Sequence, residues 1–397
     1  MTRAAIRLAL CLAWTSCPSA ASPSAGASEE RADVADRQGV RPWEDRTLST
    51  AGGAAPYPPS PVIERVEFDF STHRRLAPGS DNWPVTWSDD DRLYTAWGDG
   101  GGFGGTNSRG RVPLGVARID GDAADDSGHN VWGGWNTDHP AQFGGKSYGI
   151  LSVGGVLFMW VACQPNPHLG ACRLARSADH GATWSLADWA FRFEDRLTIP
   201  TFVNFGRDYA GARDGFVYSF YIEPAWGPAR SPTGPYGFDV HKPGRLYLSR
   251  VPKDAILDRA CYEFYSGLAA DGRPAWSGDV HDKRPVFEDP NGVGWNLSVS
   301  FNPGLRRYLL CTEHARTHAG RLGIFDAAEP WGPWTTVVYA DDWGAGEIEV
   351  STFYWSFPTK WLSADGARFT LVFTGKNTND AWNTVGGRFL IKRAPDP

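Results

Sequence analysis

The sequence has few of the features that mark helical, membrane-spanning or zinc-binding proteins. Only 2 of its 397 residues are methionine, and long polar segments with the apolar periodicity of a helix are hard to find. No apolar run reaches the roughly 18 residues that a membrane-spanning helix needs. No CxxC or HExxH pattern suggests zinc. These absences disfavour an α-helical fold, a transmembrane protein and a zinc enzyme.

A basic surface is missing as well. The 39 lysines and arginines are outnumbered by 45 aspartates and glutamates, which gives a formal net charge of −6, and the basic residues form no stripe. A nucleic acid is therefore not an expected partner. Nothing in the sequence demands a cofactor or a metal, so we predict neither, and we expect a monomer.

The cysteines are few, and two of them stand close together. Cys163 and Cys172 bracket a loop rich in proline and glycine, CQPNPHLGAC. In an exported protein this spacing predicts a local disulfide, with two unpaired thiols as the alternative. Cys261 and Cys311 cannot be paired from the sequence.

The first residues resemble a secretory signal peptide. They contain two arginines, a short apolar stretch and then small residues toward Ala21, where cleavage is expected. This start predicts a secreted or periplasmic protein. Cys17 raises the question of a lipid anchor, but the preceding AWTS fits a lipobox poorly. The predicted organisation is a signal peptide at 1–21, a disordered Ser/Ala/Pro/Gly-rich linker at 22–61 and one folded domain at 62–397.

Glycine, proline and tryptophan are abundant, with 46, 29 and 19 residues. This composition is typical of many short strands joined by Gly/Pro turns. Five times along the chain, an apolar strand meets a turn and a second strong strand follows. These hairpins span residues 83–99, 147–164, 201–223, 296–314 and 357–376.

Each hairpin is followed by a third strand, and three are followed by a fourth. The third strands are expected at 112–120, 172–179, 245–251, 321–327 and 388–394, and the fourth at 184–193, 262–268 and 334–340. Five units of three or four antiparallel strands predict an all-β fold, the five-bladed β-propeller. The last unit has no room for a fourth strand, so residues 66–70, VEFDF, are expected to supply it and close the ring. A β-sandwich is the alternative, but it gives no reason for five equivalent hairpins.

One local motif supports the propeller. SADHGATW matches the Asp box of sialidases and related propellers, S-x-D-x-G-x-T-W, at Ser177, Asp179, Gly181, Thr183 and Trp184. The aspartate would hydrogen-bond turn backbone, the glycine would take an unusual φ, and the tryptophan would pack between strands. The motif is structural and belongs to the blade periphery, so we exclude Asp179 from the functional site.

The topology also predicts where a site would lie. In each blade the second strand runs back beside the innermost first strand, so the start of the first and the end of the second share one face, here called the mouth. The candidate catalytic carboxylates at these ends are Asp81, Asp99, Glu223 and Glu313. The candidate substrate-binding residues are Trp83, Lys146, Gln164, Trp295, Asn296, His314, Trp355, Lys376 and Asn377. Two carboxylates on adjacent strand ends can lie about 5–10 Å apart, the range that glycosidases use.

Several candidates also have a purely structural interpretation. Asp99 opens a Gly-rich loop, and Asp-Gly is an ordinary turn signal. Asp81 can organise the turn that follows it, Lys146 can pair with a mouth acid, and His314 can be a hydrogen-bonding residue of the rim. The three aspartates at 89–91 lie at the opposite face and are expected to form a solvated turn.

Several long stretches resemble a family of secreted bacterial five-bladed propellers long labelled only as a domain of unknown function. They are DNWPVTWSDDDRLYTAWGDG, KSYGILSVGGVLFMW, LYLSRVPKDAI, YEFYSGLAADGRPAWS and FDAAEPWGPWTTV. The likeness covers residues 62–394. Some members look to be endo-D-arabinanases, which cut the furanose chains of cell-wall arabinan. Their essential acids belong to the first-blade region, so the resemblance implies Asp81 and Asp99 here.

We therefore expect an exported glycoside hydrolase that acts on a furanose-containing polysaccharide. Asp81 and Asp99 would form the acid/base or nucleophile set, with Glu223 or Glu313 assisting, and a metal at the propeller axis stays open. One alternative is a non-catalytic carbohydrate-binding propeller, whose acids would be far apart or locked by backbone hydrogen bonds. A scaffold for protein partners would instead show a flat apolar patch. A sialidase-like exo-glycosidase is weaker, because an arginine triad and a Tyr/Glu pair cannot be assigned from the repeats.

Overall fold

The computed structural model describes residues 54–162, 171–226, 238–239, 242–315, 317–348, 351–375 and 380–392. The predicted signal peptide, nearly all of the predicted linker, and Cys163, Gln164, Lys376 and Asn377 lie outside these ranges. Within them the chain forms strands and short 3₁₀ helices, so the all-β prediction is confirmed. Among the helices of the described ranges, none has the length and apolar character needed to span a bilayer.

The strands form five successive groups, numbered here in chain order. The first contains β2 (Val85–Trp87), β3 (Leu93–Gly98), β4 (Leu114–Asp120) and β5 (Ser127–Trp132). The second contains β6 (Lys146–Val153), β7 (Val156–Ala162), β8 (Cys172–Ser177) and β9 (Ser185–Leu186). The third contains β10 (Thr198–Asn204), β11 (Phe216–Ile222), β14 (Arg245–Pro252), β15 (Glu263–Leu268), β16 (Pro274–Ser277) and β17 (Pro285–Glu288). The fourth contains β18 (Leu297–Asn302), β19 (Arg307–Glu313), β20 (Leu322–Ala327) and β21 (Thr335–Tyr339). The fifth contains β22 (Phe353–Ser356), β23 (Arg368–Thr374), β24 (Trp382–Ile391) and β1 (Ile63–Leu76).

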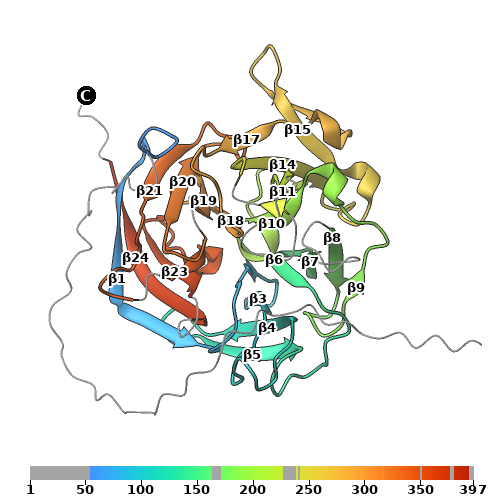
Figure 1. Cartoon of the computed structure of the whole chain (residues 1–397), viewed down its shortest axis with the longest axis vertical. Coiled ribbons are helices and arrows are strands. Elements are labelled where there is room, and N and C mark those ends of the chain that lie inside the picture. The colour runs from blue at the N-terminus through green and yellow to red at the C-terminus, as the bar shows by residue number, and fades with distance from the viewer. Residues whose placement is uncertain are drawn as a thin grey trace, which may run out of the picture. The chain divides into compact units, whose positions relative to one another are not determined.

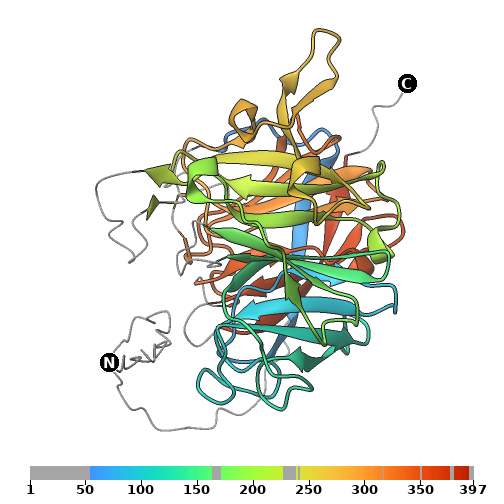
Figure 2. The ribbon, with the colours of Figure 1, turned by 90° about the vertical axis from the view of Figure 1, so that its right-hand side faces the viewer.

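Smaller elements complete the described chain. The two-stranded sheet of β12 (Ala225–Trp226) and β13 (Phe238–Asp239) follows β11. The 3₁₀ helices are η2 (Phe193–Asp195), η3 (Arg207–Tyr209), η4 (Arg259–Cys261), η5 (Val280–Asp282) and η6 (Thr359–Trp361). The hairpin of β15 and β16 projects from the third group in both views (Figures 1 and 2).

Within a group, neighbouring strands pair antiparallel, and in the third group β17 pairs with β14. The groups themselves are joined in two ways. The first, second and fifth groups are separate 4-stranded sheets. The third and fourth share one 10-stranded sheet, because β10 and β18 pair in parallel at Val203 with Val299 and at Asn204 with Ser300. In Figure 1 the groups follow one another around the view, with β6, β10 and β18 toward its middle.

The first strand of the described chain completes the last group. β1 pairs antiparallel with β24, from Ile63 opposite Ile391 to Leu76 opposite Trp382 (Figure 1). The prediction that residues 66–70 supply a strand to the last unit is therefore confirmed.

The first strands of all five groups line one small cavity. Its volume is about 10 Å³, and its walls include Val85, Ile150, Thr201, Val299 and Tyr354. Polar contacts cross between the groups here: the Tyr354 hydroxyl donates to the Tyr148 carbonyl at 2.9 Å, and Ser298 Oγ donates to the Trp355 carbonyl at 2.7 Å. A space of this size corresponds to about one water molecule, so side chains fill the centre and a larger ligand must bind elsewhere.

Candidate functional site

Asp81 and Asp99 are brought together by the backbone at the mouth end of the first group. Asp81 forms an antiparallel bridge with Gly98, the last residue of β3, through N–H···O distances of 3.0 and 2.7 Å. Asp99 follows directly with a φ of 55°, in the left-handed region. Non-glycine residues are uncommon in this region, and such strained positions cluster at functional sites.

Two cations hold the Asp99 carboxylate. Lys146, the first residue of β6, places its Nζ 2.5 Å from Oδ1, and Arg111 places its Nη2 3.3 Å from Oδ2. The Asp99 side chain is 38% exposed, so a ligand can reach it. Of the two roles expected for Lys146, pairing with a mouth acid is the one the structure contains, and the pair joins the second group to the first.

Gly98 creates the space in which these groups meet. A Cβ at this residue would lie 2.9 Å from Oδ1 of Asp81 and 3.3 Å from Nζ of Lys146. Nζ is in turn 2.5 Å from Oδ1 of Asp99. Since a straight line is the shortest path, the two Oδ1 atoms lie less than about 9 Å apart, within the range of glycosidase carboxylate pairs.

The Asp81 carboxyl differs from that of Asp99 in its surroundings. Burial raises the pKa of Asp81 to about 7, and the negative charge of Asp99 adds to the effect. Lys146, Arg111 and a hydrogen bond of 2.7 Å from Asn82 Nδ2 oppose this rise in pKa. The site therefore combines a carboxyl that can hold its proton near neutral pH with a carboxylate that is ion-paired.

Glu223 is buried among groups that it holds in place. Its side chain is 3% exposed and lies 2.5 Å from Arg196 Nη2, while Arg245 Nη1 lies 3.6 Å away. The Tyr247 hydroxyl donates to its Oε2 at 2.8 Å. Both oxygens are occupied, so this carboxylate is suited to positioning the arginines.

Glu313 is more deeply buried, with 0% exposure at the end of β19. Its oxygens accept from the His318 amide at 2.6 Å and from Thr317 Oγ1 at 2.8 Å, and the backbone of Trp295 also donates. Burial raises the pKa of Glu313 to about 7, against these hydrogen bonds. The carboxyl therefore ties together the backbone on both sides of the β18–β19 pair and does not face the solvent.

His314 lies in the interior and not on the rim. It is 1% exposed, stacks on Tyr339 with ring centroids 3.8 Å apart, and shares a 2.8 Å hydrogen bond through Nε2 with the Ala340 carbonyl. Burial lowers the pKa of His314 to about 4. The neutral ring therefore donates from Nε2 and is not placed to act as a general base at the mouth.

Two of the predicted sugar-stacking tryptophans need correction. Trp83 is 0% exposed, packs against Trp97 and Trp382, and donates its Nε1–H to the Ala381 carbonyl. Trp355 is 1% exposed and packs against Trp343. Both indoles join the core, because a first strand is covered on both sides by neighbouring groups.

The remaining predicted residues divide by exposure. Asn296 is 2% exposed, which leaves it little surface for a ligand. Trp295 is partly exposed and keeps the role predicted for it as a proposal. Gln164, Lys376 and Asn377, and the partner expected for Cys172, lie outside the described residues.

The residues of the predicted Asp box form one closed turn. Asp179 accepts from the Thr183 amide at 2.9 Å and from the hydroxyls of Ser177 and Thr183 at 2.7 and 2.6 Å. Gly181 has a φ of +89°, and Trp184 donates to its carbonyl at 2.9 Å. Both carboxylate oxygens of Asp179 are thus used within the turn.

The sequence did not single out Arg111, Arg196, Arg245 or Tyr247. A weak signal was present, because Arg245 and Tyr247 alternate at the start of a third strand and so share one face. Arg111 and Arg196 lie in loops, where no repeat predicts which way a side chain turns.

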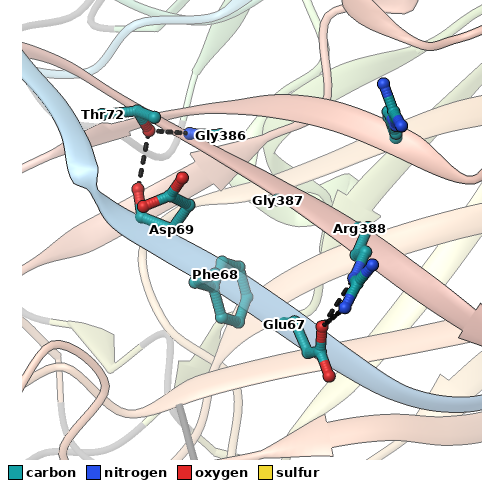
Figure 3. Close-up of a pocket in the computed structure, with 8 residues that line it drawn as sticks. Glu67, Phe68, Asp69, Thr72, Gly386, Gly387 and Arg388 are labelled. Carbon is teal, nitrogen blue, oxygen red and sulfur yellow. Dashed lines mark hydrogen bonds and ion pairs between the residues drawn. The ribbon is translucent and has the colours of Figure 1, made fainter. Parts of the chain in front are cut away.

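Two other features lie outside the mouth. Asp89, Asp90 and His180 are close enough to hold a metal ion, but Asp89 already pairs with His180 at 2.8 Å and Asp90 with Arg92 at 3.2 Å. A cavity of about 410 Å³ lies over β1 and β24, where Glu67 and Arg388 pair and Gly386 donates to Thr72 Oγ1 (Figure 3). None of the residues that line this cavity is a predicted site residue.

A family model matches residues 149–384, which is more than half of the chain. The chain belongs to the family described as Domain of unknown function (DUF4185). The matched range contains Glu223 and Glu313 but begins after Asp81 and Asp99. No curated protein sequence matches this DUF4185 chain.

Several solved structures resemble the DUF4185 chain. One is a hydrolase candidate from Bacteroides ovatus ATCC 8483, with 12% identity, a TM-score of 0.49 and coverage of 81% of this chain and 89% of that one. A thermostable family-43 glycoside hydrolase has 13% identity, a TM-score of 0.43 and coverage of 86% and 98%. The GH43_1 enzyme from Xanthomonas citri has 13% identity, a TM-score of 0.43 and coverage of 80% and 89%.

Proposed function

We propose that this protein is an exported glycoside hydrolase of the endo-D-arabinanase type, which cleaves a furanose-containing polysaccharide at the mouth of a five-bladed β-propeller. The observation that carries the proposal is the pair of unlike carboxyl groups, Asp81 and Asp99, both under the influence of the Lys146 ammonium. Unlike environments for two nearby carboxyl groups are what acid and base roles require.

The five groups of strands would be the blades of the propeller. Their first strands line a common central cavity, and β1 pairs with β24, so the fifth group takes one strand from the start of the described chain. Asp81, Asp99 and Lys146 stand where first strands begin and second strands end, which is the face at which a propeller binds its ligand. The closed turn around Asp179 would be an Asp box on the periphery.

Asp81 would be the general acid. A pKa of about 7 leaves a large protonated fraction at neutral pH, so its carboxyl can give a proton to the oxygen of the leaving sugar. Asp99 would activate a water molecule or attack the anomeric carbon, because its side chain is exposed and is positioned by ion pairs with Lys146 and Arg111.

The pH dependence of the Asp81 proton fits this assignment. Once Asp81 loses its proton, above about pH 7, two negative charges share the site and the leaving group has no proton donor. The rate is therefore expected to fall on the alkaline side with a midpoint near the pKa of Asp81.

Glu223 and Glu313, which the sequence placed in the catalytic set, would act indirectly. Glu223 is occupied by two arginines and a tyrosine, and Glu313 by backbone and hydroxyl donors. Neither has a free oxygen for substrate, so each would be a positioning residue for its part of the mouth.

The resemblance of the first-blade stretch to endo-D-arabinanases supports the choice of substrate. It concerns residues 81–100, which carry Asp81 and Asp99. The mouth was predicted to bind a furanose polysaccharide through tryptophan and amide side chains. Of these predicted side chains, Trp295 is a partly exposed ring.

The test is reducing-end release from D-arabinan, L-arabinan, arabinogalactan, xylan and a sialylated glycan. Wild type is compared with Asp81→Asn and Asp99→Asn, and with Asp91→Asn as the matched control. Asp91 is 56% exposed and belongs to the turn at the opposite face. Activity on one glycan that the two mouth variants lose and the control keeps supports the proposal, with circular dichroism to check folding.

The alternative is a carbohydrate-binding propeller without catalysis. This alternative predicts that the acids of the mouth are held by backbone hydrogen bonds. Glu313 fits that prediction, because it accepts from the His318 amide. Asp99 does not fit it, because its partners are the side chains of Lys146 and Arg111. Retained binding to one glycan with no release from any member of the panel would favour this alternative.

A further inference from the structure

The third group carries a second charged cluster at the mouth, which the proposed reaction does not use. It is built on the buried Glu223 and contains Arg196, Arg245, Tyr247 and Lys283. Arg196 precedes β10 and Glu223 follows β11, which are the mouth ends of the first and second strands of the group.

Each of the two arginines contacts the buried Glu223 on one side and is exposed to solvent on the other. Glu223 is 3% exposed, whereas the side chains of Arg196 and Arg245 are 49% and 44% exposed. Arg196 Nη2 lies 2.5 Å from the buried carboxylate and Arg245 Nη1 lies 3.6 Å from it. About half of each guanidinium side chain therefore faces solvent, while the buried half is fixed.

The backbone around the start of β10 adopts uncommon conformations. Arg196 has a φ of 53° and Ile199 has a φ of 49°, although a β-branched residue is a true outlier in the left-handed region. The pairing of β10 with β11 also shifts register between Thr198 and Thr201. Such bulges and strained residues re-aim side chains next to binding sites and persist only where the surrounding structure maintains them.

The cluster contains three cations, two of which pair directly with carboxylates. Arg245 Nε also pairs with Glu288 at 3.1 Å. Lys283 Nζ lies 5.2 Å from the Tyr247 ring and donates to the Val280 carbonyl at 3.1 Å. Within the described part of the chain no carboxylate lies within ion-pair distance of Lys283, and Glu223, Asp195 and Asp279 act on it only at longer range. Arg196 and Arg245 thus share the carboxylates of Glu223 and Glu288, and Lys283 adds a third positive charge near Tyr247.

We propose that Arg196 and Arg245 form a subsite for one carboxylate of the glycan, that of an acidic sugar. The inference rests on the proposed function for the presence of a glycan, but the binding it describes needs no turnover. A planar guanidinium fork matches a carboxylate with two parallel hydrogen bonds. The arginine pair already holds one carboxylate, Glu223, on its buried side, so its spacing suits a second one on the exposed side.

The experiment is calorimetric titration of the full chain with D-glucuronate and D-galacturonate, beside their methyl esters and inorganic phosphate. The ester keeps the ring and removes the charge, so the acids are expected to bind at least about tenfold more tightly than the esters. Raising the salt concentration should reduce this difference, because the cations are half exposed.

The variant is Arg196→Lys, which keeps a positive charge beside the buried Glu223 and removes the fork. It is expected to weaken binding of the acid by about tenfold and to leave the weak binding of the ester within about twofold. The matched control is Arg92→Lys, whose side chain is 45% exposed and pairs with Asp90 and Asp120 away from the mouth. This control should change neither affinity.

The outcomes separate the possibilities. Equal affinity for acid and ester, no binding of any probe, or an equal loss in the Arg92 variant overturns the subsite. Phosphate binding more tightly than either uronate overturns the carboxylate assignment. Because titration measures binding alone, failure of the polysaccharide panel under the proposed function leaves this result independent, and failure here leaves the role of Asp81 and Asp99 intact.

Discussion

The first and fourth groups place an acid at the same point of the repeat, and the two acids have opposite surroundings. Asp99 follows β3, is 38% exposed and pairs with two cations, whereas Glu313 ends β19, is 0% exposed and accepts from neutral donors. Position in the repeat therefore determines where a carboxyl group lies, but the residues contributed by neighbouring elements determine what it can do. In the first group that residue is Lys146, which comes from the second group.

The largest expected effect concerns the pair in the first group. Asp81→Asn and Asp99→Asn should each lower the hydrolysis rate by about 100- to 10,000-fold, the usual range for loss of a general acid or base. Because the two residues act as a unit, the double variant should lose little more activity than the less active of the two single variants. Rate measurements on the glycan identified by the panel check this, and losses that multiply would contradict a shared role.

The next effect sharpens the contrast through the fourth group. The pKa of Glu313 is raised to about 7 from 4.5, so the folded protein binds more protons than the unfolded chain between these pH values. The stabilising contribution of the protonated carboxyl is therefore complete below about pH 4.5 and is lost as pH rises through about 7. The free energy by which wild type exceeds Glu313→Gln should shrink by up to about 3 kcal/mol between pH 5 and pH 8. Urea unfolding at several pH values measures it, and a difference that does not depend on pH would contradict the interpretation.

A smaller effect is expected at the third group. Glu223→Gln keeps an acceptor for Tyr247 but removes the charge that holds Arg196, which should cost about 2 kcal/mol of unfolding free energy. The control is Glu288→Gln, because Glu288 is 54% exposed and pairs with the same Arg245. It should cost less than about 1 kcal/mol. Thermal or urea unfolding distinguishes the two, and equal costs would show that burial of Glu223 is not what matters.

The smallest effect concerns the cations around Asp81. Lys146 and Arg111 both lower the pKa of Asp81, and Lys146 has the larger influence. Lys146→Met should therefore move the alkaline limb of the pH–rate profile to higher pH, and Arg111→Met should move it in the same direction by less. A shift toward lower pH in either variant would contradict Asp81 as the proton donor.

The sequence predicted the fold better than it predicted the site. The strand repeat anticipated the hairpins of the first four groups and the contribution of residues 66–70 to the last one, because alternation and turn residues are local signals. The fifth hairpin was predicted at 357–376, but its first strand, β22, is formed by residues 353–356 and lies before that range. Strand ends also located Asp81, Asp99 and Lys146 close together.

The local sequence pattern could not predict which side chains of the site are exposed to solvent. Trp83 precedes a first strand, as Asp81 does, and Trp355 lies within one, but the indoles of both enter the core. The arginines around Glu223 come from a loop with positive φ and from a third strand, and their meeting depends on tertiary contact. Sequence alternation reports which face a residue takes, and the neighbouring group decides whether that face is open.

The pairing of β1 with β24 also has a consequence for how the chain reaches its final state. The partner strand of residues 63–76 is formed by residues 382–391, which the ribosome makes more than 300 residues later. β1 must therefore wait unpaired until β24 has been made, and the four other groups can pair their own strands first. A circular permutant that joins the β1 segment directly behind β24 would remove this wait, and it should refold faster at the cost of no contact within the sheets.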